Sequence, residues 1–216
     1  DLGLLKGDGI KRLVLGAERW LMRRFDRVST ISQRMHQRLL DKGVLTAKAV
    51  LAPNWVDISA ITPMPTGQAA PGSFRAELGI APDAVVALYS GNMGGKQGLE
   101  LLADVAKLCQ AQAGPAQPAI VFVFCGNGAG RADLVQRCAG LAHVHFLDLQ
   151  PMERLNALLA MADVHLLPQR ADAADLVMPS KLTGMLASGR PVLATAHPGT
   201  ELALVVAGGD ATAGVR

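Results

Sequence analysis

Residues 84–98 read AVVALYSGNMGGKQG, and residues 119–130 read AIVFVFCGNGAG. Each stretch starts with an almost wholly apolar run and ends in a glycine-rich turn, and a segment of helical character follows each turn. Apolar runs of this length, alternating with helices, are typical of strands that are buried on both faces of a parallel sheet. The two stretches therefore predict an α/β domain with a doubly wound parallel sheet.

The chain after residue 130 repeats this alternation. We expect further strands at 144–147, 164–167 and 192–195, and helices at 99–112, from 131 to about 140, at 151–161 and at 180–187. Pro151 suits the first turn of a helix, because that position needs no backbone N–H. The stretch from 168 to 178 is expected to be a loop.

The first fifty residues have a different pattern. We expect a helix at 10–26, an extended segment at 28–31, a second helix at about 33–42 and another extended segment at 50–51. Ser32 is suited to cap the second helix and Gly43 to end it. Proline, glycine and alanine then become frequent, which predicts a linker. The expected organisation is a small segment (1–52), a linker (53–72) and the doubly wound domain (73–216).

Composition excludes several classes of protein. Half of the 216 residues are hydrophobic, whereas a disordered chain has too little apolar surface to offset the entropy of ordering. No apolar run reaches the roughly 18 residues that a transmembrane helix needs, and the first residues lack the pattern of a signal peptide. The three cysteines (Cys109, Cys125 and Cys138) form no CxxC pair. They are expected to be free thiols in a reducing, cytoplasmic compartment.

The excess of positive over negative charge lies at one end of the chain. Residues 1–40 hold nine basic and four acidic residues, whereas the other 176 hold twelve and fourteen. This distribution, with few aromatic residues, argues against a nucleic-acid-binding protein. The basic helix at 10–27 has two interpretations: contact with an anionic membrane at its inner face, or a core helix with a solvated arginine face. The second is favoured, because Trp20, Leu21 and Phe25 would suit an interdomain core.

Three loops follow strands at the edge where parallel sheets bind ligands. The first, at 90–98, contains Gly91, Asn92, Met93 and Lys96. Its glycines leave backbone N–H groups uncovered. Lys96 lies near the positive end of the dipole of the following helix, which is an unfavourable place for a cation unless an anion lies beside it. A tight turn with a solvated lysine would explain the same residues equally well.

The second loop, at 125–130, nearly matches the dinucleotide motif GxGxxG. Gly126 and Gly128 have the right spacing, but Arg131 stands where the third glycine would be. The acidic residue expected about 20 positions later would be Asp148. A tight strand-to-helix turn is as good an interpretation as a ligand loop.

The third loop, at 175–181, reads DLVMPSK. Pro179 precedes Ser180, which we expect to cap the helix at 180–187 and to leave backbone N–H groups free for an anion. Lys181 again opposes the helix dipole. An ordinary capped helix would explain this loop alone, but a second such lysine at the same edge favours a diphosphate held between Lys96 and Lys181.

No metal site is expected. His143 and His145 alternate on a short strand and are expected to be half-buried, whereas His165 lies in an apolar run and is expected to be a core histidine. Cys125 is better explained as a small buried side chain than as a nucleophile. The chain has no GxSxG motif, so hydrolase chemistry has no support.

The stretches SGNMGGKQGLE, FCGNG, LNALLAMADVHLLPQ and MPSKLTGMLASGRPVLA, in this order and spacing, resemble the C-terminal domain of retaining glycosyltransferases of family 4. The resemblance covers roughly 10–207, and PNWVD at 53–57 looks like the family's interdomain crossover. It implies the GT-B fold of two Rossmann-like domains. Residues 73–216 would then bind the nucleotide-sugar donor, and 1–52 would be the end of the acceptor domain. The similarity is to the colanic-acid and O-antigen type, which implies exopolysaccharide or O-antigen synthesis.

The resemblance also implies roles for single residues. Lys96 matches the family's phosphate-binding lysine, and Ser180 and Lys181 match the helix start that faces the phosphates. Gly126 and Asn127 match the turn near the nucleotide. Gly91, Met93 and Pro179 belong to the same donor-binding loops, and the segment around Leu149 matches the one that lines the base.

The chain also departs from the family pattern. Asn92 stands where many members have an arginine. The family's paired glutamates, eight residues apart, align with Leu176 and Gly184, and Asp175 lies one position from the first of them.

The implied reaction is transfer of a sugar, with retention, from a GDP- or UDP-linked donor to a glycan acceptor attached to a lipid. The donor would be a substrate, with no cofactor and no metal. Lys96 and Lys181 would stabilise the departing diphosphate. Two other readings stay open: a nucleotide-sugar epimerase of similar architecture, and a non-catalytic nucleotide-binding module.

Overall fold

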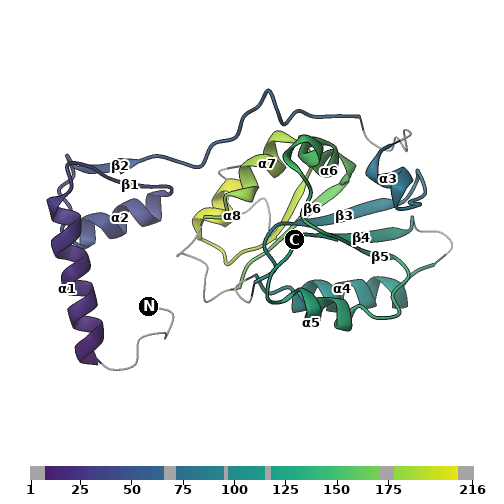
Figure 1. The fold of residues 1–216 in the computed structure, drawn as a ribbon, viewed down its shortest axis with the longest axis horizontal. Helices are drawn as coiled ribbons and strands as arrows, with labels where there is room; N and C mark the ends of the chain where they lie inside the picture. Colours follow the sequence, from purple (N-terminus) through teal and green to yellow (C-terminus); the bar gives the residue numbers. More distant parts are fainter. Residues whose placement is uncertain (1–7, 66–71, 95–96, 115–117, 171–177, 209–216) are drawn as a thin grey trace. The chain divides into compact units, whose positions relative to one another are not determined.

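The structure is a computed structural model that describes residues 8–65, 72–94, 97–114, 118–170 and 178–208. The chain forms two compact units, Asp1–Asn54 and Trp55–Arg216. The boundary between the units falls inside the predicted linker. Figure 1 shows the elements of both units along the chain.

The smaller unit has the elements predicted for it. They are α1 (Asp8–Arg24), β1 (Val28–Thr30), α2 (Gln33–Asp41) and β2 (Ala49–Leu51), with β1 and β2 paired in parallel. The Ser32 side chain accepts a hydrogen bond from the Met35 N–H and so caps α2. Gly43, at φ +85°, ends it. Lys42 and Glu18 form an ion pair at 2.6 Å that connects α1 to the end of α2.

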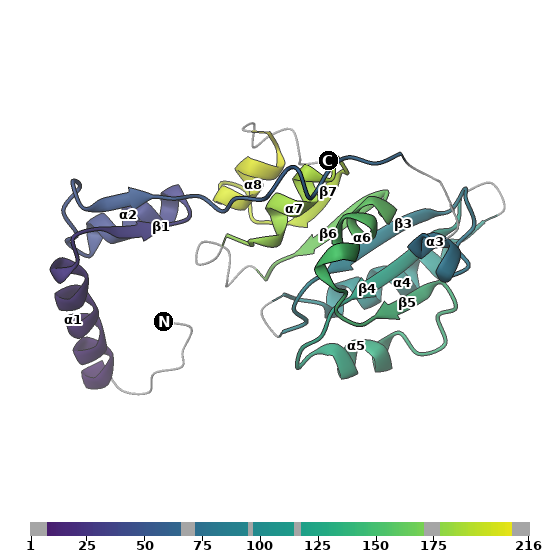
Figure 2. The same ribbon diagram turned by 45° about the horizontal axis from the view of Figure 1, so that its top comes forward.

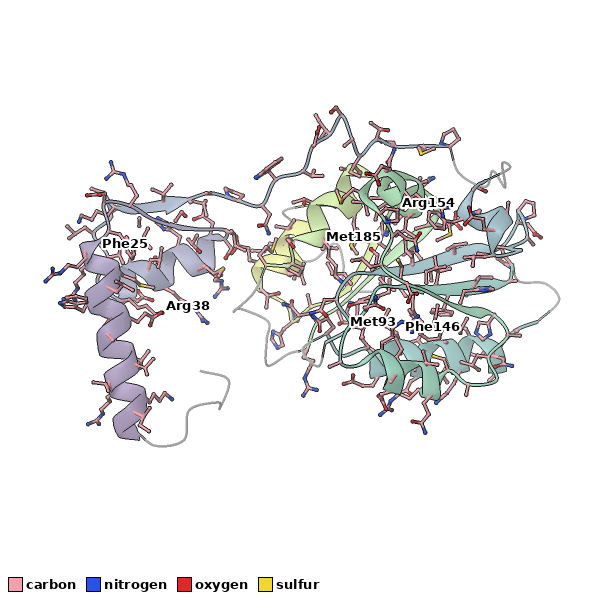
Figure 3. All side chains as sticks on the ribbon, viewed as in Figure 1. Phe25, Arg38, Met93, Phe146, Arg154 and Met185 are labelled. Atoms are coloured by element: carbon pink, nitrogen blue, oxygen red, sulfur yellow. The ribbon has the colours of Figure 1, made fainter. Side chains whose placement is uncertain are left out.

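Apolar side chains of α1 remain exposed within the described residues. Leu13 is 75% and Trp20 59% exposed, and the others are Ile10, Val14, Leu15 and Leu21, with Phe25 just after the helix. Figure 3 labels Phe25, together with Arg38 on α2. No helix among the described residues combines the length and apolar character that crossing a membrane requires.

The larger unit contains a five-stranded parallel sheet in the order β5-β4-β3-β6-β7. Its strands are β3 (Val85–Ser90), β4 (Ile120–Cys125), β5 (Val144–Leu147), β6 (Val164–Pro168) and β7 (Val192–Thr195). All five lie within one residue of the predicted bounds. The predicted fold class, an α/β domain with a parallel sheet, is confirmed.

Helices cover both faces of this sheet (Figures 1 and 2). The helices are α3 (Phe74–Glu77), α4 (Glu100–Ala111), α5 (Arg131–Arg137), η1 (Met152–Arg154), α6 (Leu155–Met161), α7 (Lys181–Ala187) and α8 (Glu201–Val206). One core lies under α4 and α5 and includes Tyr89, Phe122 and Phe124. A second lies under α3 and α6 and includes Val86 and Val123. Because neighbouring strand residues enter opposite cores, the apolar runs at 85–90 and 120–125 are buried on both faces.

Several details differ from the expectation. The edge strands β5 and β7 are half-buried to exposed rather than buried on both faces, since each has a neighbour on one side only. The helix expected from Pro151 is divided into the 3-10 turn η1 and α6. The short helices α3 and α8 were not predicted, because four and six residues show no readable apolar period.

A buried arginine fixes β3 against β6 at their amino ends. Arg75, only 3% exposed, donates to the carbonyl oxygens of Ala84 (3.0 Å) and Met161 (3.2 Å). Its guanidinium also pairs with Asp163 at 2.5 Å, and the same carboxylate accepts the Val86 N–H at 2.7 Å. A buried charge is tolerated only when it is paired and hydrogen-bonded in this way. The network holds in place the two strands whose opposite ends form the candidate site.

A second arginine holds part of the predicted linker against the domain. The Arg190 guanidinium donates to the carbonyl oxygens of Met64 (2.8 Å), Pro65 (3.3 Å) and Ala160 (2.9 Å). The segment that ends at Pro65 therefore follows the larger unit, although its composition is that of a linker.

Candidate functional site

The strand order reverses between β3 and β6. The chain runs from β3 outward through β4 to β5, then returns and runs outward through β6 to β7 on the other side. In open parallel sheets, ligands bind outside the carboxyl ends of the strands at such a switch point. Here the edge is formed by the residues that follow Ser90, Cys125 and Pro168. The predicted loops at 90–98 and 125–130 start there, whereas residues 175–177 of the third lie outside the described residues.

The two glycine-rich turns are joined by backbone hydrogen bonds. The Met93 N–H donates to the Asn127 carbonyl (2.9 Å), and the Gly130 N–H donates to the Met93 carbonyl (2.7 Å). The Met93 side chain is fully buried among residues of α4 and α5, and Figure 3 labels it at this end of the sheet. The resemblance places Met93 in a donor-binding loop. In the structure its side chain is buried, and both of its backbone groups join the two turns.

The glycines of the second turn are required by this packing. Gly126 has φ +136°, and a Cβ on it would overlap the carbonyl oxygen of Gly91. Gly128 has φ +150°, and a Cβ there would lie 2.6 Å from the Met93 carbonyl oxygen. The Gly126 N–H already donates to the Leu147 carbonyl at 3.0 Å, so it is not free for a phosphate. The interpretation as a tight turn therefore explains these glycines.

Lys181 lies at the centre of the switch point. Its Nζ is 3.9 Å from the centre of the Tyr89 ring, and its side chain passes over Gly91, where a Cβ would come within 3.3 Å of its Cδ. This Nζ is buried and has no hydrogen-bond partner among the described residues. Burial lowers the pKa of Lys181 from 10.5 to about 8. The Tyr89 ring faces the ammonium by a cation–π contact, and its hydroxyl donates to the Asn92 carbonyl at 2.7 Å.

Ser180 does not have its predicted role as a cap. Its backbone is already helical (φ −62°, ψ −29°), and its side chain makes no capping hydrogen bond. Its carbonyl accepts a hydrogen bond from the Thr183 hydroxyl at 2.9 Å. Ser180 is exposed and Pro179 half-buried at this edge. The prediction of a side-chain cap was wrong because the backbone of Ser180 is helical and not extended, as a capping residue requires.

The other predicted donor-binding residues lie on the surface at the same edge. Asn92 and Asn127 are exposed on the two turns, and Leu149 is 73% exposed after β5. Beside Leu149, the exposed Asp148 forms an ion pair with Arg131 at 3.1 Å. Arg131, which replaces the third glycine of the dinucleotide motif, thus connects the second turn to the end of β5.

Two predicted residues, Lys96 and Asp175, lie outside the described residues. The sequence reasoning also missed two that the structure brings to the switch point: Tyr89 under Lys181, and Arg170, which follows β6 and lies 3.6 Å from Glu100. Both are near the end of a predicted strand. A position near the end of a strand was a usable signal for both residues. The side chains that they contact, Lys181 and Glu100, are distant from them in sequence.

The remaining reactive side chains are structural. His165 is fully buried, contacts the Ser188 hydroxyl at 3.0 Å, and has its pKa lowered to about 4, mainly by burial. Cys125 is buried, and burial raises the pKa of its thiol. Both agree with the expectation, as do the half-buried His143 and His145. Among the described residues, no group of three or more His, Cys, Asp or Glu side chains is placed to hold a metal ion.

Comparison with known proteins assigns a family. A family model described as "Glycosyl transferases group 1" matches residues 84–215. The chain is also 36% identical, over 199 residues, to a putative colanic acid biosynthesis glycosyl transferase, WcaI, of Escherichia coli (strain K12). That match covers 91% of this chain and 47% of the relative. The chain therefore spans about half the length of the curated relative it matches.

Solved structures share the fold. Anabaena Alr3699/HepE in complex with UDP-glucose matches with a TM-score of 0.64 at 20% identity, covering 85% of this chain and 48% of that one. Sucrose-phosphate synthase from Thermosynechococcus elongatus matches with a TM-score of 0.63 at 20% identity, covering 90% and 48%. WaaG, a glycosyltransferase involved in lipopolysaccharide biosynthesis, matches at 0.62 and 17% identity, covering 84% and 47%. At these identities the likeness concerns the fold alone.

The contact between the two turns predicts unequal effects of two glycine substitutions. Gly126→Ala should lower the free energy of unfolding by about 3 kcal/mol or more, because the new methyl group meets backbone that cannot move aside. Gly140→Ala is the control. It also has a positive φ (+82°), but a Cβ there meets nothing within 4 Å, so about 1 kcal/mol is expected. Urea unfolding measures both; equal losses would contradict the account of the turns.

Proposed function

The chain belongs to the group 1 glycosyl transferases, and we propose that it carries the donor-binding domain of an enzyme that transfers a sugar, with retention, from a nucleoside diphosphate to a glycan. The proposed setting is exopolysaccharide or O-antigen synthesis. The 36% identity to a putative colanic acid biosynthesis glycosyl transferase supports this setting. A lipid-linked acceptor is part of the same proposal.

The observation that carries the proposal is the buried amine of Lys181. An ammonium group without a hydrogen-bond acceptor is costly to bury, and this one lies at the edge where such sheets bind ligands. A diphosphate would supply the missing acceptors as charge-assisted hydrogen bonds. The cost of burial is thus offset in the complex, whereas without a diphosphate only the Tyr89 ring, among the described residues, faces the ammonium.

The positive charge of Lys181 also suits the proposed sugar transfer. Negative charge grows on the diphosphate as its bond to the sugar breaks, and a fixed cation in a site with little water stabilises that charge more in the transition state than in the ground state. We propose Lys181 and Lys96 as the residues that supply it, without a metal or cofactor. Because α7 has only seven residues, the lysine contributes more than the helix dipole.

The donor would lie across the described loops. Gly91, Asn92, Asn127, Pro179 and Ser180 surround the phosphates in this proposal, with Asp175 nearby. Leu149 would contact the base. UDP and GDP are both candidates for the nucleotide, and the HepE structure, which contains UDP-glucose, supports testing UDP first.

The smaller unit is proposed to be the end of an acceptor domain. Its supports are the exposed apolar side chains of α1 and the match to only 47% of the length of the relative. In this arrangement 53–72 is the connection between the domains, and 73–216 binds the donor.

Calorimetric titration of the chain with UDP, GDP and NAD tests the proposed function. We expect one nucleoside diphosphate to bind and NAD to bind more weakly or not at all. Lys181→Met keeps the apolar stem and removes the charge, so it should lower the affinity for that diphosphate about tenfold or more. Its affinity for the corresponding nucleoside should be unchanged.

Other results of these experiments would contradict the proposed function or the role of Lys181. Preference for NAD would refute a nucleotide-sugar transferase. Binding of a diphosphate that Lys181→Met leaves unchanged would remove Lys181 from the site. A complete enzyme that binds the donor but transfers no sugar would favour the non-catalytic module, and release of a C2-inverted sugar would favour an epimerase.

Contact of residues 10–27 with the inner face of a cytoplasmic membrane is the second interpretation of α1. Its arginines and exposed Trp20 support it, whereas the exposed apolar residues equally suit a domain interface. Co-sedimentation with vesicles containing anionic lipid should show binding that disappears when Arg23, Arg24 and Arg27 are changed to Gln. Equal binding to neutral and anionic vesicles, or equal binding by the triple variant, would contradict it.

A further inference from the structure

Arg170 occupies a fixed position at the carboxyl end of β6. The preceding residue, Gln169, is held to β7 by two hydrogen bonds with the Thr195 hydroxyl: the Gln169 N–H donates to it (3.0 Å), and it donates to the Gln169 carbonyl (3.2 Å). The backbone that carries Arg170 is thereby tied to the sheet. Its side chain extends from there toward the first glycine-rich turn.

Gly98 leaves room for the side chain of Arg170. Gly98 has φ +65°, and a Cβ on it would lie 3.4 Å from Cγ of Arg170. The aliphatic part of Arg170 therefore lies against this glycine, which closes the loop before α4. The guanidinium then reaches the first turn of α4, where Nη1 is 3.6 Å from Oε1 of Glu100.

The ion pair between Arg170 and Glu100 is one in which a stronger anion can replace Glu100. The two side chains are 48% and 50% exposed, and exposed pairs at this distance contribute little to stability because water screens them. The Arg75–Asp163 pair in the same domain is different, since its arginine is buried and its oxygen and nitrogen are 2.5 Å apart. A guanidinium can bind two phosphate oxygens at once, so a phosphate would be a stronger partner than a half-exposed carboxylate.

We propose that Arg170 is a further donor-binding cation that Glu100 holds in the free chain and that transfers to the diphosphate when the donor binds. The inference rests on the proposed function. It follows from where the two cations lie: Lys181 contacts the turn at Gly91 and Arg170 contacts it at Gly98. Arg170, just after β6, and Lys181, at the start of α7, thus place a positive charge at each end of the first glycine-rich turn.

Calorimetry with UDP and GDP, and with uridine and guanosine as probes without phosphate, tests the proposal. Arg170→Ala should weaken binding of the preferred diphosphate about tenfold and leave nucleoside binding unchanged. Arg170→Lys should recover part of the loss, because it keeps the charge but not the paired donors. Arg137→Ala is the matched control, since Arg137 also forms an exposed ion pair, with Asp133 on α5.

Glu100→Gln tests the exchange itself. If Glu100 competes with the donor for Arg170, this variant should bind the diphosphate severalfold more tightly than the parent chain. The gain should vanish when Arg170→Ala is already present, because interacting residues are not additive. Thermal unfolding of each variant checks that the fold is kept.

Three results would overturn the inference. They are unchanged diphosphate affinity in Arg170→Ala, an equal loss for nucleoside and diphosphate, and a gain from Glu100→Gln that persists without Arg170. Failure of the parent chain to bind either diphosphate would be different, because it would refute the proposed function and the inference with it.

Discussion

The candidate site depends on one desolvated ammonium group. Lys181 lies over the ring of Tyr89 and against Gly91, with its amine buried. A side chain at position 91 would occupy its path, and a smaller residue at 89 would remove the ring that faces it. Arg75 and Asp163 tie β3 to β6 at the opposite ends of these strands.

The described residues of the two glycine-rich turns pack against each other, and the N–H groups of Met93, Gly126 and Gly130 are already used in backbone hydrogen bonds. Gly126 and Gly128 are needed for this close approach. Groups that are already held in place need little reorganisation when a charged ligand arrives. Two charged side chains lie at the ends of the first turn, Lys181 beside Gly91 and Arg170 beside Gly98.

The sequence predicts most of the fold, since burial on both faces makes the runs at 85–90 and 120–125 apolar at every position but Ser90. It predicts less of the site. Lys181 was found from its unfavourable place at a helix start, a local signal, and Ser32 was correctly read as a cap in the same way. A motif does not show that the Met93 side chain faces inward, nor that the Ser180 backbone is already helical, so that Ser180 does not cap α7 with its side chain. Tyr89 acts through Lys181, Arg170 through Glu100 and Arg190 through Met64, and no local pattern reveals these distant partners.

The ionisation of Lys181 tests the central claim most directly. With 13C-labelled lysine, the resonance missing from Lys181→Met can be followed by NMR as pH is raised. The account predicts a pKa of about 8 in the free chain, and a rise by a unit or more when the preferred nucleoside diphosphate binds, because the added negative charge favours the protonated amine. A free-chain pKa near 10.5, or one that the bound diphosphate leaves unchanged, would contradict it.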